Sequence, residues 1–333
     1  MRYRTFGRTG LRVSELVLGA MTFGEQGGVG APLEECRRIL DAYSDAGGNM
    51  VDTAINYRGG ASEEIVGELL EGRRDRFVLS TKYTVTRDAT DPNGGGNHRR
   101  NLRLSLETSL RRLRTDHIDV YWVHIWDRHT PIEETMRALD DAVTAGKVLY
   151  IGISDAPAWL VSRANTLAEW RGWTPFAGLQ IPYSLVNRDA ERELLPMADA
   201  FGLSVTAWSP LGGGVLSGKY DKDDRANAQH TRLTRADISE HDLNIARAVR
   251  EVADELGATS AQVALAWTRQ RPGVLPMLGA RTEAQILDNL RCTDIELTPE
   301  LRERLEAATG FKPGFPTDFI AQTEQWVLGR AAL

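Results

Sequence analysis

Short apolar runs rich in β-branched and aromatic residues alternate with amphipathic stretches along almost the whole chain. The apolar runs have the length and composition of buried strands. Eight are expected, at residues 16–21, 49–54, 77–83, 118–126, 148–154, 178–183, 203–208 and 274–278. Between them, apolar residues recur at the spacing of one helix face. The helices expected from this spacing are residues 33–45, 62–70, 100–112, 132–145, 157–169, 189–201, 239–256 and 283–290.

This alternation predicts an α/β fold. Eight strand–helix pairs close into a (β/α)8 TIM barrel more naturally than they form an open sheet. A hairpin-like opening at residues 3–14 comes before the barrel, and helices at 261–270 and 299–307 are additions to it. Barrels of about 250 residues fold as one unit. No Pro/Gly/Ser-rich linker or internal repeat divides the 333 residues, so a single domain over residues 1–333 is predicted.

Residues that exchange protons lie at the ends of three successive predicted strands. Asp52, Lys82 and His124 lie at these ends, and Tyr57 follows the first of them. Active sites of barrels lie at the C-terminal ends of the strands, so these four side chains are expected to meet at one rim. Any one of them alone would be an ordinary solvated loop residue. The set of four favours a catalytic site.

The four residue types together suit proton delivery to an oxyanion. A free tyrosine, with a pKa of about 10, is a weak proton donor at neutral pH. An ammonium about 4 Å away stabilises the phenolate by up to about 4 kcal/mol at an effective dielectric of about 20. Lys82 can supply this charge, and the Asp52 carboxylate can keep a buried lysine protonated. His124, as a neutral imidazole, can orient or polarise a carbonyl.

Nothing in this set donates a hydride, so a cofactor is expected to bind the second half of the chain. The usual nucleotide motifs are incomplete. Gly28-Val29-Gly30 lacks the third glycine of the dinucleotide fingerprint, and the near P-loop at residues 213–219 is followed by Tyr220 instead of Ser or Thr. An ATPase is rejected on that ground. The amides of Gly212 to Gly214 either lie near a pyrophosphate or belong to a flexible surface loop.

Composition excludes several classes of partner. The formal charge of −6 argues against nucleic acid and anionic membranes. The arginines of residues 99–114 are interleaved with leucines at helical spacing and are expected on a solvated helix face. The two cysteines have no metal-ligand spacing, so neither a disulfide nor a metal site is predicted. The polar N-terminus and the absence of an apolar run of about 20 residues predict a cytoplasmic protein.

At this point several motifs resemble the aldo-keto reductase superfamily, in the same order and at the same spacing. The resemblance runs from Phe6 to Leu290. The motifs are Asp52-Thr53-Ala54-Ile55-Asn56-Tyr57, Ser80-Thr81-Lys82, Ile118-Asp119-Val120-Tyr121 with His124, Gly152-Ile153-Ser154, Ala207-Trp208-Ser209-Pro210-Leu211-Gly212, and Gly279-Ala280-Arg281-Thr282 with Gln285 and Asn289. The resemblance implies an NADP(H)-dependent carbonyl reductase on a (β/α)8 barrel. It implies that Tyr57 donates the proton, that Lys82 and Asp52 tune it, and that His124 orients the carbonyl.

The same resemblance implies a set of cofactor-binding residues. Ser154 and Gln180 would hold the nicotinamide carboxamide, and Trp208 would stack on its ring. The rest of the cofactor would be lined by Ser209, Pro210, Leu211, Gly212, Gly218, Lys219, Gly279, Arg281, Gln285 and Asn289. Arg281, at the start of a helix, suits the 2′-phosphate, because the helix N-terminus adds its own positive end. NADPH is therefore expected to be preferred over NADH.

The substrate is expected to be a small carbonyl compound. Phe23, Tyr83 and Trp126 lie near the predicted rim and suit a nonpolar or aromatic carbonyl, or else serve as lid packing. Asp155 stands where many relatives have an asparagine, and it is left outside the predicted site. Three alternatives stay open: a keto-sugar substrate, a redox-sensing subunit like the potassium-channel beta subunits, and a Schiff-base aldolase that uses Lys82. The sequence does not indicate the physiological substrate, the direction of the reaction or the oligomeric state.

Overall fold

The computed structural model describes residues 1–26, 28, 30–220 and 237–329, so Val29 of the glycine-rich segment lies outside the described residues. Eight parallel strands close into a barrel in chain order, with β10 joining β9 to β3. These strands are β3 (Val17–Gly19), β4 (Met50–Asp52), β5 (Val78–Tyr83), β6 (Ile118–Val123), β7 (Val148–Ser154), β8 (Phe176–Pro182), β9 (Ser204–Trp208) and β10 (Val274–Leu278). The predicted (β/α)8 barrel is confirmed.

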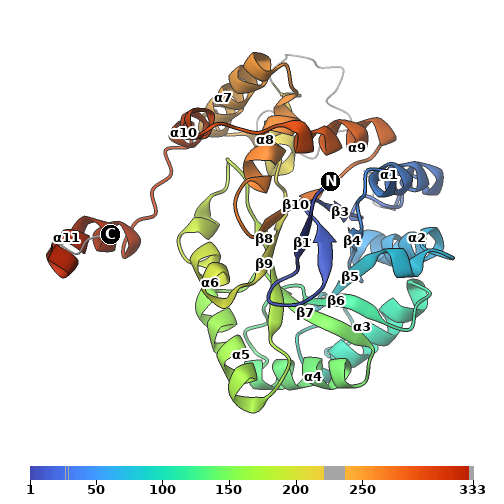
Figure 1. Ribbon diagram of the computed structural model, residues 1–333. Helices are drawn as coiled ribbons and strands as arrows, with labels where there is room; N and C mark the ends of the chain where they lie inside the picture. The colour runs from blue at the N-terminus through green and yellow to red at the C-terminus, as the bar shows by residue number, and fades with distance from the viewer. Residues whose placement is uncertain (27, 29, 221–236, 330–333) are drawn as a thin grey trace.

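Helices surround the barrel, and one lies apart from it (Figure 1). The surrounding helices are α1 (Leu33–Asp45), α2 (Ala61–Leu69), α3 (Arg99–Arg112), α4 (Ile132–Thr144), α5 (Ala158–Arg171), α6 (Leu194–Phe201), α7 (Glu240–Leu256), α8 (Ser260–Arg269), α9 (Glu283–Leu290) and α10 (Pro299–Ala308). The last helix, α11 (Thr317–Leu328), was not predicted and stands at the end of an extended segment (Figure 1).

The N-terminal hairpin closes one end of the barrel. Its strands β1 (Tyr3–Thr5) and β2 (Arg12–Ser14) pair antiparallel. Phe6 in its turn is fully buried and meets the Trp122 indole edge to face, with ring centroids 6.1 Å apart. Trp122 fits inside the barrel because glycines lie beside it: a Cβ at Gly152 would lie 2.3 Å from the indole, and one at Gly178 would lie 2.8 Å from it. Aromatic side chains therefore fill the barrel interior beneath the strand ends.

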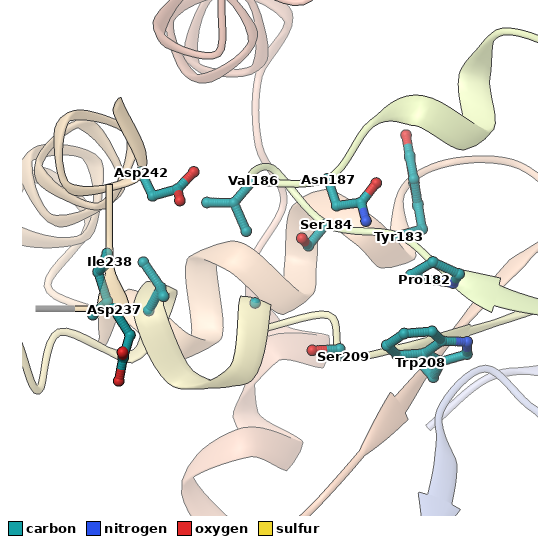
Figure 2. A pocket seen from close by; sticks show the side chains of 12 residues that line it. Pro182, Tyr183, Ser184, Val186, Asn187, Trp208, Ser209, Asp237, Ile238 and Asp242 are labelled. Atoms are coloured by element: carbon teal, nitrogen blue, oxygen red, sulfur yellow. The ribbon is translucent and has the colours of Figure 1, made fainter. Parts of the chain in front are cut away.

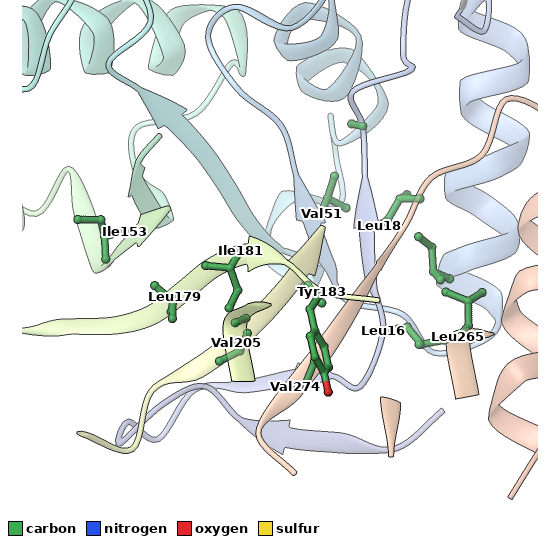
Figure 3. Close-up of a cluster of buried hydrophobic side chains, with 14 of the residues drawn as sticks. Leu16, Leu18, Val51, Ile153, Leu179, Ile181, Tyr183, Val205, Leu265 and Val274 are labelled. Carbon is green, nitrogen blue, oxygen red and sulfur yellow. The ribbon is translucent and has the colours of Figure 1, made fainter. Parts of the chain in front are cut away.

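A second apolar layer lies between the barrel and its helices. Successive side chains of a strand point to opposite faces, so residues that alternate with the interior ones pack outward. Figure 3 shows part of this layer, including Leu18, Val51 and Ile181. Tyr83 of β5 belongs to it and stacks on Tyr121 of β6, with ring centroids 5.4 Å apart. Its neighbour Lys82 consequently points into the barrel.

One predicted helix is wrong over its first part. Residues 189–201 form a short turn, η3 (Asp189–Glu191), followed by the separate helix α6. Between them Glu193 has a φ of −137°, outside the helical region. The cause is Pro196, which has no amide to donate to the carbonyl of residue 192 and whose ring would clash with that carbonyl. Proline is tolerated only in the first turn, so α6 begins two residues before it.

Two further observations concern only the described part of the chain. No helix there is both long and apolar enough to cross a membrane. No group of three or more His, Cys, Asp or Glu side chains there is arranged to hold a metal ion. The interpretation of residues 1–333 as a single domain stays a prediction.

Candidate active site

Four of the predicted residues meet where β4, β5 and β6 end. Asp52 is the last residue of β4 and pairs with Ser80 of β5, two residues before Lys82. Lys82 pairs with Trp122 of β6, two residues before His124. Tyr57 begins the short turn η1 (Tyr57–Gly60) that follows β4. The parallel register thus brings the acid set, Asp52, Tyr57, Lys82 and His124, to one rim.

Lys82 is fully buried, and each of its three hydrogen-bond donors has an acceptor. Its ammonium donates to the Asp52 carboxylate, to the Thr53 carbonyl at 2.8 Å and to the Tyr57 phenol oxygen at 3.1 Å. Burial alone would lower the pKa of Lys82, but the Asp52 carboxylate and the Tyr57 oxygen raise it above its ordinary value. An ammonium has three donors and no acceptor. The phenol oxygen therefore accepts from Lys82, and the phenol proton stays available to another acceptor.

Asp52 is held by more than its ion pair with Lys82. One carboxylate oxygen accepts from the Ser80 hydroxyl at 2.7 Å and from the side-chain amide of Gln180 at 3.3 Å. Gln180 comes from β8, on the other side of the barrel. It was predicted to contact a nicotinamide carboxamide, and its side chain lies directly beside the acid set.

His124 presents a neutral imidazole to Tyr57. The two rings meet edge to face, with centroids 5.8 Å apart and an interplanar angle of 80°. Burial, and then the charge of Lys82, lower the pKa of His124 to about 3. Within the described residues its buried Nδ1 has no hydrogen-bond partner. Buried N–H groups are rarely left without an acceptor, so we assign the proton to Nε2.

The low pKa of His124 makes the protein less stable in acid. Below about pH 6.5 the unfolded chain binds a proton at this histidine, but the folded chain does not do so until the pH approaches about 3. Stability should therefore fall as the pH drops through this window, by at most about 1.4 kcal/mol per pH unit. Urea unfolding of wild type and His124→Asn from pH 7.5 downward measures this, and the variant should lose less stability. If the stabilities of the two proteins fell in parallel with pH, the lowered pKa of His124 would be contradicted.

The turn that carries Tyr57 is fixed by an arginine from α3. Arg112 donates to the Ile55 carbonyl at 2.9 Å and to the buried Glu63 carboxylate at 3.2 Å. Its guanidinium lies against Gly60, where a Cβ would be only 2.4 Å away. Gly60 also has a φ of 103°, which favours glycine. Arg112 therefore departs from the solvated helix face that was predicted for it.

Trp208 is the last residue of β9 and is 37% exposed. Its indole N–H donates to the Asp155 carboxylate at 3.2 Å. Burial raises the pKa of Asp155, and hydrogen bonds from Trp208 and Ser154 partly offset this. Asp155 was left out of the predicted site, but the structure brings it into contact with a predicted cofactor residue. The only feature of the sequence that pointed to Asp155 was that many relatives have an asparagine at this position.

A pocket of about 280 Å³ lies beside Trp208 (Figure 2). Three of the predicted cofactor residues, Trp208, Ser209 and Gly212, line it. None of the four residues of the acid set does. The pocket thus extends from the indole toward the turn after β9, and the acid set lies outside its lining.

The glycine turn after β9 is hydrogen-bonded within itself. The Gly212 amide donates to the Ser209 carbonyl, the Gly213 amide to the Ser209 hydroxyl and the Gly214 amide to the Leu211 carbonyl, each at 2.9 Å. One of the two predicted roles for these amides was contact with a pyrophosphate. In the structure, each amide already donates to an acceptor within the turn. The Lys219 ammonium lies against the same turn, 2.4 Å from where a Cβ of Gly214 would be. Pro210 and Gly218 lie at either end of this turn.

The remaining predicted cofactor residues lie in the segment before α9 and along that helix, with Asn289 in its last turn. Gln285 accepts the Arg281 amide at 2.8 Å through its side-chain oxygen. Asn289 donates to the Gly279 carbonyl at 3.5 Å. A Cβ at Gly279 would meet no atom within 4 Å. Arg281 before the helix, the side-chain amides of Gln285 and Asn289 along it and the open space at Gly279 could hold a nucleotide phosphate and its base.

Of the three predicted substrate residues, Trp126 alone is partly exposed. Phe23 and Tyr83 are fully buried. Trp126 is partly exposed and meets Trp159 of α5 edge to face, with ring centroids 5.7 Å apart. Arg128 lies 5.9 Å from the Trp126 ring centroid. Trp159 was not predicted as a site residue, because its contact with Trp126 depends on tertiary packing.

Comparison with known proteins agrees with this geometry. The sequence model of the aldo/keto reductase family matches residues 15–309 of this chain. A norsolorinic acid reductase from Emericella nidulans is 40% identical over 327 residues, which cover 95% of this chain and 83% of that protein. An aryl-alcohol dehydrogenase (NADP+) from Phanerodontia chrysosporium is 37% identical over 328 residues, covering 92% and 85%. An aryl-alcohol dehydrogenase from Pestalotiopsis microspora is 38% identical over 320 residues, covering 93% and 82%.

The family match extends over most of the barrel and includes every residue of the acid set. Members of this family use nicotinamide cofactors. The chain therefore belongs to the aldo/keto reductase family and is an oxidoreductase that acts on carbonyl or alcohol groups.

Proposed function

We propose that this protein reduces an aromatic aldehyde or ketone to the alcohol with NADPH. The observation that carries the proposal is the Lys82 ammonium, which bonds Asp52 and Tyr57 at once while the His124 ring packs on Tyr57. Bound beside Trp208, NADPH would supply the hydride. Tyr57 would donate its proton to the carbonyl oxygen, and Lys82 would stabilise the phenolate that is left. The Nε2–H of His124 would donate to the same oxygen.

An aromatic substrate is supported by the rim and by the names of the relatives. Trp126, two residues after His124 in the chain, is partly exposed and meets the exposed Trp159 ring edge to face. Offset and edge-to-face contacts of this kind favour an aromatic ring. The related proteins are named aryl-alcohol dehydrogenases and norsolorinic acid reductases. A keto-sugar has no comparable support, because the rim side chains are indoles.

The Schiff-base alternative is disfavoured by the state of Lys82. A nucleophilic amine must be neutral and must have its lone pair free. Here neighbouring oxygens raise the pKa of Lys82, and all its donors are engaged. The cytoplasmic location and the absence of a nucleic-acid or membrane partner stay predictions from the sequence.

Initial rates of NADPH consumption test the proposal. With wild-type protein, an aromatic aldehyde should be reduced at least about tenfold more efficiently than a short aliphatic one, because only the former can pack a ring on the Trp126 and Trp159 indoles. Tight retention of NADPH without turnover of any carbonyl would favour a redox-sensing protein instead.

The same assay tests the preference for NADPH. Arg281→Leu should raise the KM for NADPH by about tenfold or more, as expected for the loss of a hydrogen bond to a charged group, and should change the KM for NADH little. Arg291→Leu, at the exposed end of the same helix, is the matched control. Equal losses with NADPH and NADH would refute the assignment of Arg281 to the 2′-phosphate.

A further inference from the structure

Thr84, the first residue after β5, has a backbone conformation that threonine rarely adopts. Its φ is 98°, in the region that favours glycine. For a β-branched side chain this conformation is strained, and it persists only where the surroundings enforce it. Thr84 is 8% exposed and lies beside the acid set. The side chain therefore has a role that glycine could not fill.

The Thr84 hydroxyl replaces a missing acceptor between two strands. β5 and β6 pair as far as Tyr83 and Val123. Beyond that pair, the Thr84 carbonyl turns away and accepts from the Gly96 amide at 2.8 Å. The next amide along β6 is that of His124, and it donates to the Thr84 hydroxyl at 3.2 Å. A glycine would fit the φ but would leave the partly buried His124 amide without this acceptor.

Asn97 extends this contact to the rest of the segment after β6. Its side chain is buried, donates to the Thr84 hydroxyl at 2.8 Å and donates to the Ile125 carbonyl at 3.1 Å. Its side-chain oxygen accepts the Asp127 amide at 2.5 Å. Main-chain atoms of His124, Ile125 and Asp127 are thus all held by two side chains of the loop after β5.

The orientation of the His124 ring depends on its backbone, because few contacts hold the ring itself. Within the described residues, its buried Nδ1 has no hydrogen-bond partner to set the ring orientation. The ring is located by its packing on Tyr57 and by its backbone. We propose that Thr84 and Asn97 are positioning residues, which fix the backbone of His124 so that Nε2 faces the carbonyl. This inference rests on the proposed function, because it assumes that His124 orients the substrate.

Amide hydrogen exchange tests the contact without reference to activity. In the holoenzyme with NADPH, the His124 amide should exchange slowly in wild type and in Thr84→Ser, and about tenfold or more faster in Thr84→Val, which keeps the shape but removes the acceptor. The His124 amide should also exchange fast in Thr84→Gly. Unchanged exchange at His124 in Thr84→Val overturns the proposal. Thr86→Val, at an exposed threonine of the same loop, is the matched control and should leave the His124 amide protected.

Turnover tests whether the contact serves the reaction. Thr84→Val should lower kcat/KM for the carbonyl by about 10- to 100-fold, the effect of misplacing a reacting group by about 1 Å, while the affinity for NADPH changes little. Thr84→Ser should restore turnover to within about threefold of wild type. In a His124→Asn background, Thr84→Val should cost less than about twofold, because its effect passes through the imidazole.

The outcomes separate the two proposals. An active wild type whose turnover survives Thr84→Val or Thr84→Gly overturns the positioning role and leaves the reductase proposal intact. The same loss from Thr84→Val in both backgrounds also overturns it, because the role would then be structural. A wild type that binds NADPH but reduces no carbonyl contradicts the proposed function and, with it, any role of Thr84 in the reaction.

Discussion

Tyr57→Phe is expected to lower kcat by about 10²- to 10⁴-fold, the contribution of a general acid. The phenyl ring can keep its contact with the His124 ring and its place beneath the Lys82 ammonium, which lies 4.5 Å from the tyrosine ring centroid. Only the hydroxyl that accepts from Lys82 and offers a proton is removed. Stopped-flow or steady-state loss of NADPH absorbance with an aromatic aldehyde measures the effect.

Two controls make this result specific. Tryptophan fluorescence should show that Tyr57→Phe still binds NADPH with an affinity within about threefold of wild type, since the change lies at the chemical step. Tyr3→Phe, at an exposed tyrosine of the hairpin, should retain full activity. Robust NADPH oxidation by Tyr57→Phe would rule out Tyr57 as the proton donor.

Lys82→Met is expected to damage both turnover and stability. It removes the charge that, in the proposed reaction, stabilises the phenolate, and it leaves the buried Asp52 carboxylate without its counter-ion. Removing one partner of a buried pair costs about 3–5 kcal/mol of stability. Chemical denaturation at neutral pH measures this loss. The pKa of Lys82 is raised in the fold, so its contribution is complete below the ordinary lysine pKa of about 10.4 and is lost only as the pH rises above it.

A double variant separates the two effects. Lys82→Met with Asp52→Asn removes both charges, and the asparagine can still accept from Ser80. More than half of the lost stability should return, because no uncompensated charge stays buried. Turnover should not return, because the phenol still lacks an ammonium. Recovery of turnover in the double variant would show that Lys82 acts through stability alone.

The barrel could be predicted from the sequence because each of its elements has a strong local pattern. β7, β10, α1 and α9 have the bounds that the periodicity predicts. The errors have local physical causes. Pro196 divides the helix predicted for residues 189–201. The helix α11 was not predicted, and most of its apolar side chains are exposed, with Trp326 at 82%, so burial in a core does not account for it.

The acid set could be predicted because parallel strands bring their ends together. The substrate residues could not all be predicted from nearness to a strand end. Lys82 points into the barrel, so the two-residue period of a strand sends Tyr83 outward to Tyr121. That period was readable in the sequence and would have excluded Tyr83.

The supporting residues depend on three-dimensional contacts that no local pattern encodes. Thr84 meets the amide of His124, which is 40 residues away. Its unusual φ is a property of the folded loop. Asp155 meets Trp208 across 53 residues, and it stood out in the sequence only as a departure from a resemblance.

The plugged barrel interior gives substrates a single direction of approach. Trp122 and Phe6 occupy the space beneath the acid set, and the indole fills the room that Gly152 and Gly178 leave. Any molecule that reaches Tyr57 must therefore enter from the side of the loops. Changes in those loops can alter which carbonyl compounds are admitted while the floor and the acid set stay as they are. Reaction chemistry and substrate range are thus separately adjustable in this protein.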